Sequence, residues 1–194
     1  MTTVSMEDIK KLRDETGISV MQCKKSLEEA GGDLDKARII LEKQSKVAAS
    51  KKADRTLGAG TVTSYIHNTG TVGSMVLLLC ETDFVARNDD FKALAYDIAM
   101  HIAATNPAYL KEDDINETDR TKAKEVFLEE VKDKPAEMQD KILTGKLDSY
   151  FKEKTLLRQE FIKDPSVTIA EMLERGTQKF GEKIEIGSFS RFDV

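Results

Sequence analysis

The chain has 194 residues, enough for one large domain or two small ones on the usual scale of about 100–200 residues per domain. Hydrophobic residues make up 40% and charged residues 34%, a composition that favours a folded chain over a disordered one. The longest purely apolar run, Met75–Cys80, has six residues, against about 20 for a membrane helix, and no charged-then-apolar leader opens the chain. We therefore expect a soluble, cytoplasmic protein with no membrane span.

Charge is distributed unevenly along the chain. The net charge is −5, with residues 1–58 at +2 and residues 59–194 at −7. Nucleic-acid affinity rests on clustered Lys and Arg that acidic residues do not oppose, so we expect no direct binding of nucleic acid. The asymmetry indicates two modules.

Residues 1–45 show the pattern of three short amphipathic helices. Ser5, Ser19 and Asp33 stand at N-cap positions, and Gly17 and the pair Gly31-Gly32 end the first two helices. The expected inward positions are Met6, Ile9, Leu12, Cys23, Leu27, Ala30, Leu34, Ala37, Ile40 and Leu41. Helices this short are marginal in isolation, so they must pack together as a three-helix bundle.

Residues 45–58 are small, basic and poor in large apolar groups. Such a segment cannot build a core, so we expect a solvated helical linker, assigned to residues 46–58 and ending at Gly58-Ala59-Gly60. Nucleic-acid binding by its Lys51, Lys52 and Arg55 is the less favoured interpretation, because no aromatic stacking platform accompanies them.

The periodicity changes to that of strands at the start of residues 59–194. Thr61–Ile66 alternates, a turn follows at His67–Gly70, and Thr71–Glu81 contains the apolar run of a strand covered on both faces. Asn88 or Asp89 then caps a helix, Ser166 or Thr168 starts the last helix, and Lys183–Val194 forms the last strand. The helix after Asn88 carries an apolar stripe of Phe91, Leu94, Ala95, Ile98, Ala99 and Ile102.

Residues 108–163 are predicted to be a helical insertion, interrupted at Lys134-Pro135 and at Gly145. The fold class is therefore α+β, with the N-terminal bundle followed by a single core unit of helices packed on an antiparallel sheet of about three strands.

The sequence contains no recognisable catalytic or metal-binding pattern. His67 is assigned to a turn and His101 to a partly buried helix flank, and neither has ligands at zinc spacing. Cys23 and Cys80 lie far apart and are expected to be reduced thiols, and no glycine-rich phosphate loop is present. We expect a binding protein with no cofactor, and an enzyme is the least favoured reading.

Two places carry apolar side chains without an obvious core role. Val20 and Met21 begin the second helix beside its buried stripe, where they are either incidental surface residues or a patch that docks another protein, flanked by Lys24. Phe84 stands in the short connection Thr82–Arg87, either folded inward as a lid on the helix–sheet core or projecting as a wedge.

Three segments of the chain resemble bacterial and organellar elongation factor Ts in its short form. They are ETGISVMQCKKSLEEAGGDLDKA at 15–37, CETDFVARN at 80–88 and LLRQEFIKDPSVTIAEML at 156–173, in the order of that family. The resemblance implies a nucleotide exchange factor for elongation factor Tu, with a ubiquitin-associated (UBA)-like domain at 1–45 and a core at 59–194. Val20 stands where the family more commonly has Met, which implies a smaller contact there.

The resemblance also implies roles for particular residues. Asp83 and Phe84 match the pair that inserts beside the nucleotide site of the GTPase, with Thr82 and Val85 flanking them, and Asp83 is expected to anchor the connection by hydrogen bonds. Val20, Met21 and Lys24 match the helical surface that grips its nucleotide domain. Release of GDP would follow from disturbance of the Mg²⁺ and phosphate site.

A single sheet-bearing core unit further implies a homodimer. The alternative from another class is an adaptor whose three-helix module binds ubiquitin-like or other proteins without altering any nucleotide.

Overall fold

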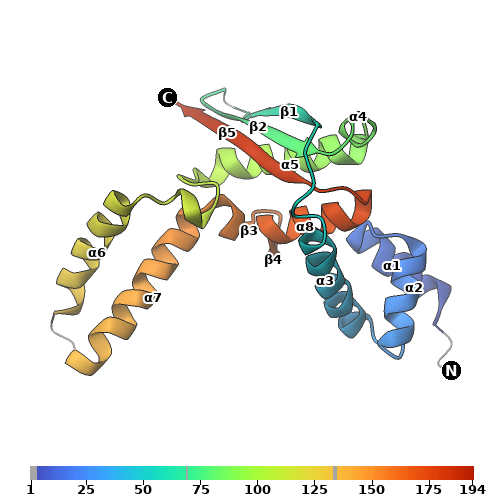
Figure 1. Cartoon of the computed structure of the whole chain (residues 1–194), viewed down its shortest axis with the longest axis horizontal. Helices are drawn as coiled ribbons and strands as arrows, with labels where there is room; N and C mark the ends of the chain where they lie inside the picture. Colours follow the sequence, from blue (N-terminus) through green and yellow to red (C-terminus); the bar gives the residue numbers. More distant parts are fainter. Residues whose placement is uncertain (1–3, 69, 133–134) are drawn as a thin grey trace.

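The computed structural model describes residues 4–68, 70–132 and 135–194. A sheet-bearing core lies in the middle of the molecule, and two helical arms extend from it toward the same side (Figure 1). One arm is the N-terminal bundle, and the other is a hairpin of two long helices. The predicted α+β class is confirmed.

The N-terminal bundle consists of α1 (Met6–Thr16), α2 (Val20–Glu29) and α3 (Leu34–Ser50). The side chains of Ser5, Ser19 and Asp33 accept hydrogen bonds from N–H groups of the first turns, as the sequence predicts. The buried apolar side chains form one cluster: Ile9, Leu12, Ile18, Cys23, Leu27, Ala37 and Leu41. The three helices thus stabilise one another by burying their apolar stripes.

Ser45 departs from the expectation that residues 45–58 are solvated. It is 1% exposed, and its hydroxyl donates hydrogen bonds to the carbonyl of Leu41 and to the side chain of Gln178. A small side chain lets α3 approach a helix of the core closely, so the lack of large apolar groups here reflects close packing. Ile40, predicted to be buried, is only partly so, and Met6, also predicted to point inward, is 74% exposed because it lies on the outer side of the first turn of α1.

The main sheet is antiparallel and has the strand order β1-β2-β5. Its strands are β1 (Ala59–Ile66), β2 (Val72–Cys80) and β5 (Glu185–Asp193). All of them lie within two residues of the predicted bounds. The register between β2 and β5 shifts at Leu77/Leu78, where Gly187 is the additional residue.

Only one face of this sheet is covered by helices. In β2, the side chains of Ser74, Val76, Leu78 and Cys80 are buried, whereas Met75 on the opposite face is 46% exposed and Leu77 and Leu79 are half-buried. The prediction that this strand is covered on both faces is therefore wrong for the single chain, because within the described residues the helices of the core cluster pack on one side only.

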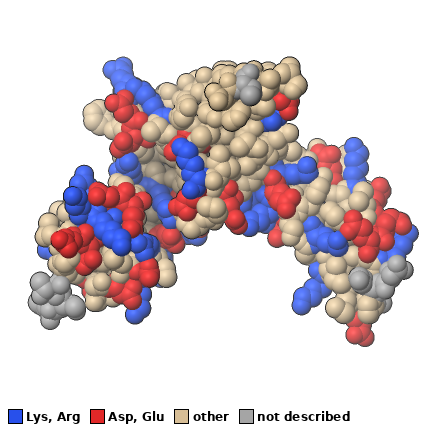
Figure 2. Space-filling model, turned by 180° about the vertical axis from the view of Figure 1, so that it is seen from behind, with Lys and Arg blue, Asp and Glu red and all other residues tan. Residues whose placement is uncertain are grey.

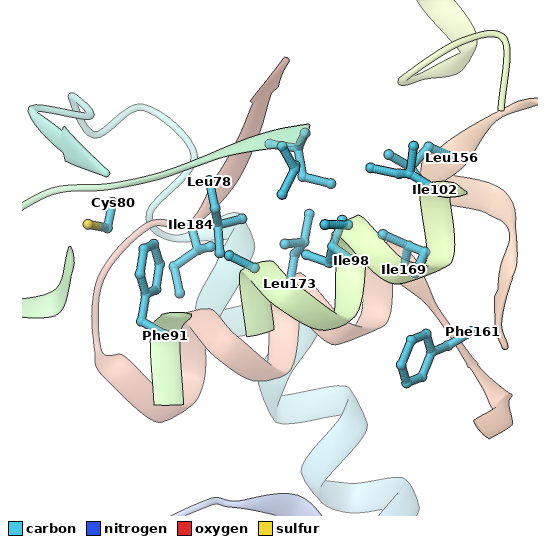
Figure 3. Packing of buried hydrophobic residues seen from close by; sticks show 14 of the residues in the cluster. Leu78, Cys80, Phe91, Ile98, Ile102, Leu156, Phe161, Ile169, Leu173 and Ile184 are labelled. Carbon is cyan, nitrogen blue, oxygen red and sulfur yellow. The ribbon is translucent and has the colours of Figure 1, made fainter. Parts of the chain in front are cut away.

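The covered face packs on α5 (Asp89–Thr105) and α8 (Ile169–Phe180), as Figure 3 shows. Asn88 caps α5, and Thr168 caps α8 in a reciprocal pair with Glu171. The core cluster includes Val76, Leu78, Cys80, Val85, Phe91, Ala95, Ile98, Ala99, Ile102, Leu156, Phe161, Val167, Ile169, Leu173, Ile184 and Ile186. The predicted stripe of α5 is the centre of this core.

The second arm consists of η1 (Glu112–Asp114), α6 (Glu117–Val131) and α7 (Ala136–Lys154). α7 runs through Gly145, contrary to the predicted interruption; a lone exposed glycine costs a helix only about 1 kcal/mol. Pro135 is the N-cap of α7, and Lys134 lies outside the described residues. Next come η2 (Leu156–Arg158) and a hairpin of β3 (Glu160–Phe161) and β4 (Asp164–Thr168), which the sequence did not predict.

Candidate functional site

Phe84 lies on α4 (Asp83–Ala86), a single helical turn between β2 and α5. Its side chain is 80% exposed. The neighbouring Val85 is buried and belongs to the core cluster. The interpretation of Phe84 as a lid on the helix–sheet core is therefore wrong, because Val85 takes the inward position of the turn and the ring of Phe84 projects from the surface.

Thr82, at the start of this connection, is fixed by a carboxylate from the far end of the chain. Glu182 accepts hydrogen bonds from the N–H of Thr82 at 3.0 Å, from its hydroxyl at 2.6 Å, and from the N–H of Glu81 at 3.1 Å. In return, the carboxylate of Glu81 accepts a bond from the N–H of Lys183 at 2.6 Å, which with Arg55 lowers the pKa of Glu81. These hydrogen bonds therefore hold the backbone in place where α4 begins.

Asp83 has a different role in the single chain from the expected one. Its carboxylate lies 3.0 Å from the guanidinium of Arg87, and both side chains are largely exposed. The bonds that fix the connection come from Glu182 instead. Sequence reasoning missed Glu182 because about 100 residues separate it from Thr82, and no local pattern marks such a pair.

Val20, Met21 and Lys24 lie on the outer side of α2. Met21 is 81% exposed and Val20 is 45% exposed, while Cys23 and Leu27 of the same helix are buried. Lys24 makes a long contact of 3.8 Å with Glu28 and is otherwise solvated. These three residues, called the tether surface below, form a small apolar patch with a positive charge beside it.

α2 and α4 lie on the same flank of the molecule, with the C-terminal end of α8 between α4 and the bundle (Figure 1). Lys179 of α8 forms an ion pair of 2.9 Å with Asp90 at the start of α5, and its side chain lies against Gly17, which precedes α2. The fold thus brings together the two segments that the sequence singled out, although 60 residues separate them.

The contacts of the two histidines are those of residues with a structural role. His67 is exposed in the hairpin turn, where its Nδ1 lies 3.1 Å from the hydroxyl of Tyr65. His101 is fully buried, more deeply than predicted; its Nε2 bonds to Gln159 at 2.9 Å, and burial lowers its pKa.

A hollow of about 780 Å³ lies between β5 and the segment before η1, away from Phe84. Its charged lining residues are Lys111, Asp114 and Glu185. Among the residues that the structure describes, no three His, Cys, Asp or Glu side chains gather as metal ligands, and no helix has the length and apolar character needed to cross a membrane.

The fold and the exposed side chains define an α+β protein with apolar projections of the kind found at protein–protein interfaces. The family model described as Elongation factor TS matches residues 37–194. The chain is similar to "Elongation factor Ts" of Thermodesulfovibrio yellowstonii, with 45% identity over 98% of this chain and 96% of that protein. It is 41% identical to that of Thermotoga petrophila over 98% and 96% of the two chains, and 42% identical to that of Fervidobacterium nodosum over 98% of both.

The chain therefore belongs to the elongation factor Ts family, as the three sequence segments indicated. It is a factor of translation elongation.

Proposed function

We propose that this protein is a guanine nucleotide exchange factor that binds elongation factor Tu and promotes release of GDP. Membership of the elongation factor Ts family supports the partner, and the projecting ring of Phe84 is the observation that carries the mechanism. In this proposal the protein works by binding, in the cytoplasm, without catalysing a covalent reaction and without direct contact with nucleic acid.

The mechanism follows from linkage between two ligands of one GTPase. A GTPase holds GDP through backbone N–H groups and Mg²⁺, so a factor that speeds release must bind the nucleotide-free state better than the GDP state. The coupling is reciprocal: GDP must weaken the factor's binding by the same ratio, typically about 1–3 kcal/mol. Burying the ring of Phe84 in a partner pocket supplies about 1.5–3 kcal/mol, which is a matching amount.

Phe84 is well prepared for this role. Val85 is fixed in the core, and Glu182 holds Thr82, so the turn between them has little freedom to lose on binding. An apolar group presented by a rigid turn keeps more of its transfer free energy as affinity than one on a mobile loop. We propose that the ring enters beside the Mg²⁺ and phosphate loop of the partner, with Asp83 next to it.

The tether surface has a separate part in the proposal. Met21 and Val20 offer apolar contact area, and Lys24, whose contact with Glu28 is long at 3.8 Å, adds a positive charge for an acidic side chain of the partner. Contacts made equally with the GDP state and the nucleotide-free state raise affinity without changing the rate of release from the complex. The tether surface therefore holds the partner while Phe84 acts on it.

A homodimer is also proposed, through the open face of the sheet. The side chains on that face are mostly apolar or small, namely Val62, Ser64, Ile66, Met75, Leu77, Leu79, Ser188, Ser190 and Phe192, and the charged Glu185 lies opposite Leu79. The surface around the hairpin of β1 and β2 carries few charges, whereas both arms are densely charged (Figure 2). A mostly apolar face with so few charges is typical of an interface between subunits.

Glycines allow a second sheet to approach this face closely. A Cβ on Gly73 would lie 2.7 Å from the end of Ile66, and one on Gly187 would lie 2.9 Å from Leu79, so these apolar side chains spread across the glycines. The sequence of β2 predicts a strand that is covered on both faces. In the dimer, the partner subunit would cover the face that is open in the single chain.

The test of exchange uses elongation factor Tu loaded with a fluorescent GDP analogue. We expect the release rate to rise with the concentration of this protein and to reach a plateau, and we expect excess GDP to weaken the complex in a pull-down. Binding that GDP does not weaken, together with an unchanged release rate, would support the adaptor alternative and contradict exchange.

A further inference from the structure

The N-terminal bundle is joined to the core along α8 by contacts between polar groups. Arg175 forms an ion pair of 2.9 Å with Glu42, and Lys46 forms one of 3.2 Å with Glu171. Ser45 adds its hydrogen bond to the side chain of Gln178. We call this set of contacts, together with Lys179, the polar seam.

The seam differs from the interior of either module. The buried apolar side chains of the described residues form separate clusters in the bundle and in the core. The charged partners across the seam are partly exposed, and exposed ion pairs contribute only about 0–1 kcal/mol each. These polar contacts accompany the close packing of α3 along α8, and they bear on how the bundle is oriented on the core.

Lys179 is the member of the seam that lies beside the segments next to both candidate surfaces. Its ammonium group lies 2.9 Å from the carboxylate of Asp90, six residues after Phe84 in the sequence. Its side chain also covers Gly17, three residues before Val20.

Gly17 is suited to this contact in two ways. It ends α1 with a φ of 67°, a conformation that favours glycine. A Cβ at this position would lie 3.2 Å from Nζ and 3.3 Å from Cδ of Lys179, so a side chain there would displace the flexible end of the lysine by a few tenths of an ångström. The lysine side chain therefore lies directly against the backbone of Gly17.

We propose that Lys179 is a positioning residue, which holds the tether surface and Phe84 at a fixed spacing so that one partner engages both at once. This inference rests on the proposed function. Its physical basis is effective concentration: when one contact is made, a rigid spacing keeps the second site close to its target, and a loose spacing dilutes it.

The first test measures spacing in the protein alone. Spin labels on the exposed positions of Lys25→Cys and Asp89→Cys report the distance between the middle of α2 and the start of α5, while the native Cys23 and Cys80 are buried. We expect a narrow distance distribution in the parent chain, a broader or shifted one with Lys179→Ala, and recovery with Lys179→Arg. The matched control is Lys163→Ala, which removes an ion pair of 2.8 Å with Asp97 elsewhere on α5.

The second test measures GDP release from elongation factor Tu at increasing concentrations of each variant. We expect Lys179→Ala to raise the half-saturating concentration about fivefold with the plateau rate unchanged, and Lys179→Arg to restore most of it. In a chain that already carries Val20→Ala and Met21→Ala, the same change should have an effect of less than about twofold, because no tether surface remains to be positioned.

The outcomes separate this inference from the proposed function. An unchanged distance distribution for Lys179→Ala, or an equal effect of Lys179→Ala with and without the tether surface, overturns the positioning role. A parent chain that does not accelerate GDP release overturns the proposed function, and the distance measurement then still decides whether Lys179 sets the spacing.

Discussion

The carboxylate of Glu182 accepts hydrogen bonds from both the N–H and the hydroxyl of Thr82, and thereby joins the segment that follows α8 to the residue that precedes α4. The bonds are charge-assisted, and the one from the hydroxyl is short at 2.6 Å, whereas the one from the N–H is 3.0 Å long. The presentation of Phe84 thus depends on a residue that has no contact with the ring itself.

Glu182→Gln should weaken the hydrogen bonds that fix Thr82 while keeping a side chain of nearly the same shape. The amide oxygen can still accept from the two N–H groups and the amide NH2 can donate to the hydroxyl of Thr82, but the bonds lose their charge assistance, so we expect the free energy of unfolding to fall by about 1 kcal/mol. The plateau rate of GDP release should also fall, since α4 gains freedom. Urea denaturation and stopped-flow release measure the two effects. Glu185→Gln is the control, because Glu185 is exposed and its carboxylate forms an ion pair of 3.1 Å with Lys183.

Phe84→Ala should separate function from stability. Because the ring is 80% exposed, we expect the free energy of unfolding to change by less than about 0.5 kcal/mol. Loss of about 1.5–3 kcal/mol of burial in the complex predicts a plateau rate of GDP release about ten to one hundred times lower. Phe84→Leu should give an intermediate rate. If a folded Phe84→Ala protein reaches the parent plateau, Phe84 has no part in the mechanism.

Met21→Ala should weaken the complex with elongation factor Tu without slowing the release of GDP from the complex once it has formed. Truncation of an apolar anchor at a protein interface commonly costs about 1–2 kcal/mol, so the half-saturating concentration should rise roughly fivefold to thirtyfold. The plateau rate should stay the same. Ile39→Ala is the matched control, since Ile39 is an exposed apolar residue on α3 of the same bundle. A lower plateau with unchanged half-saturation would assign Met21 to the release step instead.

Met75→Glu tests the proposed dimer. The side chain is 46% exposed on the open face of the sheet, so a carboxylate there remains hydrated in the monomer and would be buried in the dimer. We expect sedimentation velocity to show a dimer for the parent chain and a monomer for the variant at the same concentration. Val126→Glu on α6 is the control. A parent chain that sediments as a monomer at micromolar concentration contradicts the dimer.

The elements with strong local signals were predictable. Caps at Ser5, Ser19, Asp33 and Asn88 hold where the sequence placed them, because a cap is decided by residues three or four positions apart. The central helix with Phe91 was equally clear, since its apolar stripe continues over several turns. Local chemistry decides these features, so a single sequence contains the information.

The features that the sequence did not predict depend on residues that are distant in the chain. The short hairpin of β3 and β4 pairs only a few residues, and the close packing of Ser45 depends on Gln178, which is 133 positions away. The exposure of Phe84 could not be settled from composition either, because a large ring beside a buried strand is compatible with a core position. Its direction is decided by which residue of the α4 turn faces the core, and Val85 occupies that position.

His101 predicts how stability responds to acid. The N–H of Ile162 donates to its Nδ1 at 3.3 Å, so the proton of the neutral ring is on Nε2, which faces the Oε1 atom of Gln159. Burial lowers the pKa of His101 below its ordinary value of about 6.5, with the bond to Gln159 acting in the opposite direction. Protonation of the ring would place two donors face to face at Ile162.

The direction of the pH effect follows from the numbers of protons that the folded and unfolded chains bind at His101. Between the lowered pKa and about 6.5, the unfolded chain binds more protons at this site than the folded chain does, so stability rises with pH and is lost as pH falls below about 6.5. Glu174, whose pKa is raised by burial, changes stability in the opposite direction near its own titration. We therefore expect urea denaturation between pH 7.5 and about 5.5 to show a slope for the parent chain that is flatter in His101→Gln. Equal slopes in the two proteins would exclude His101 as the source.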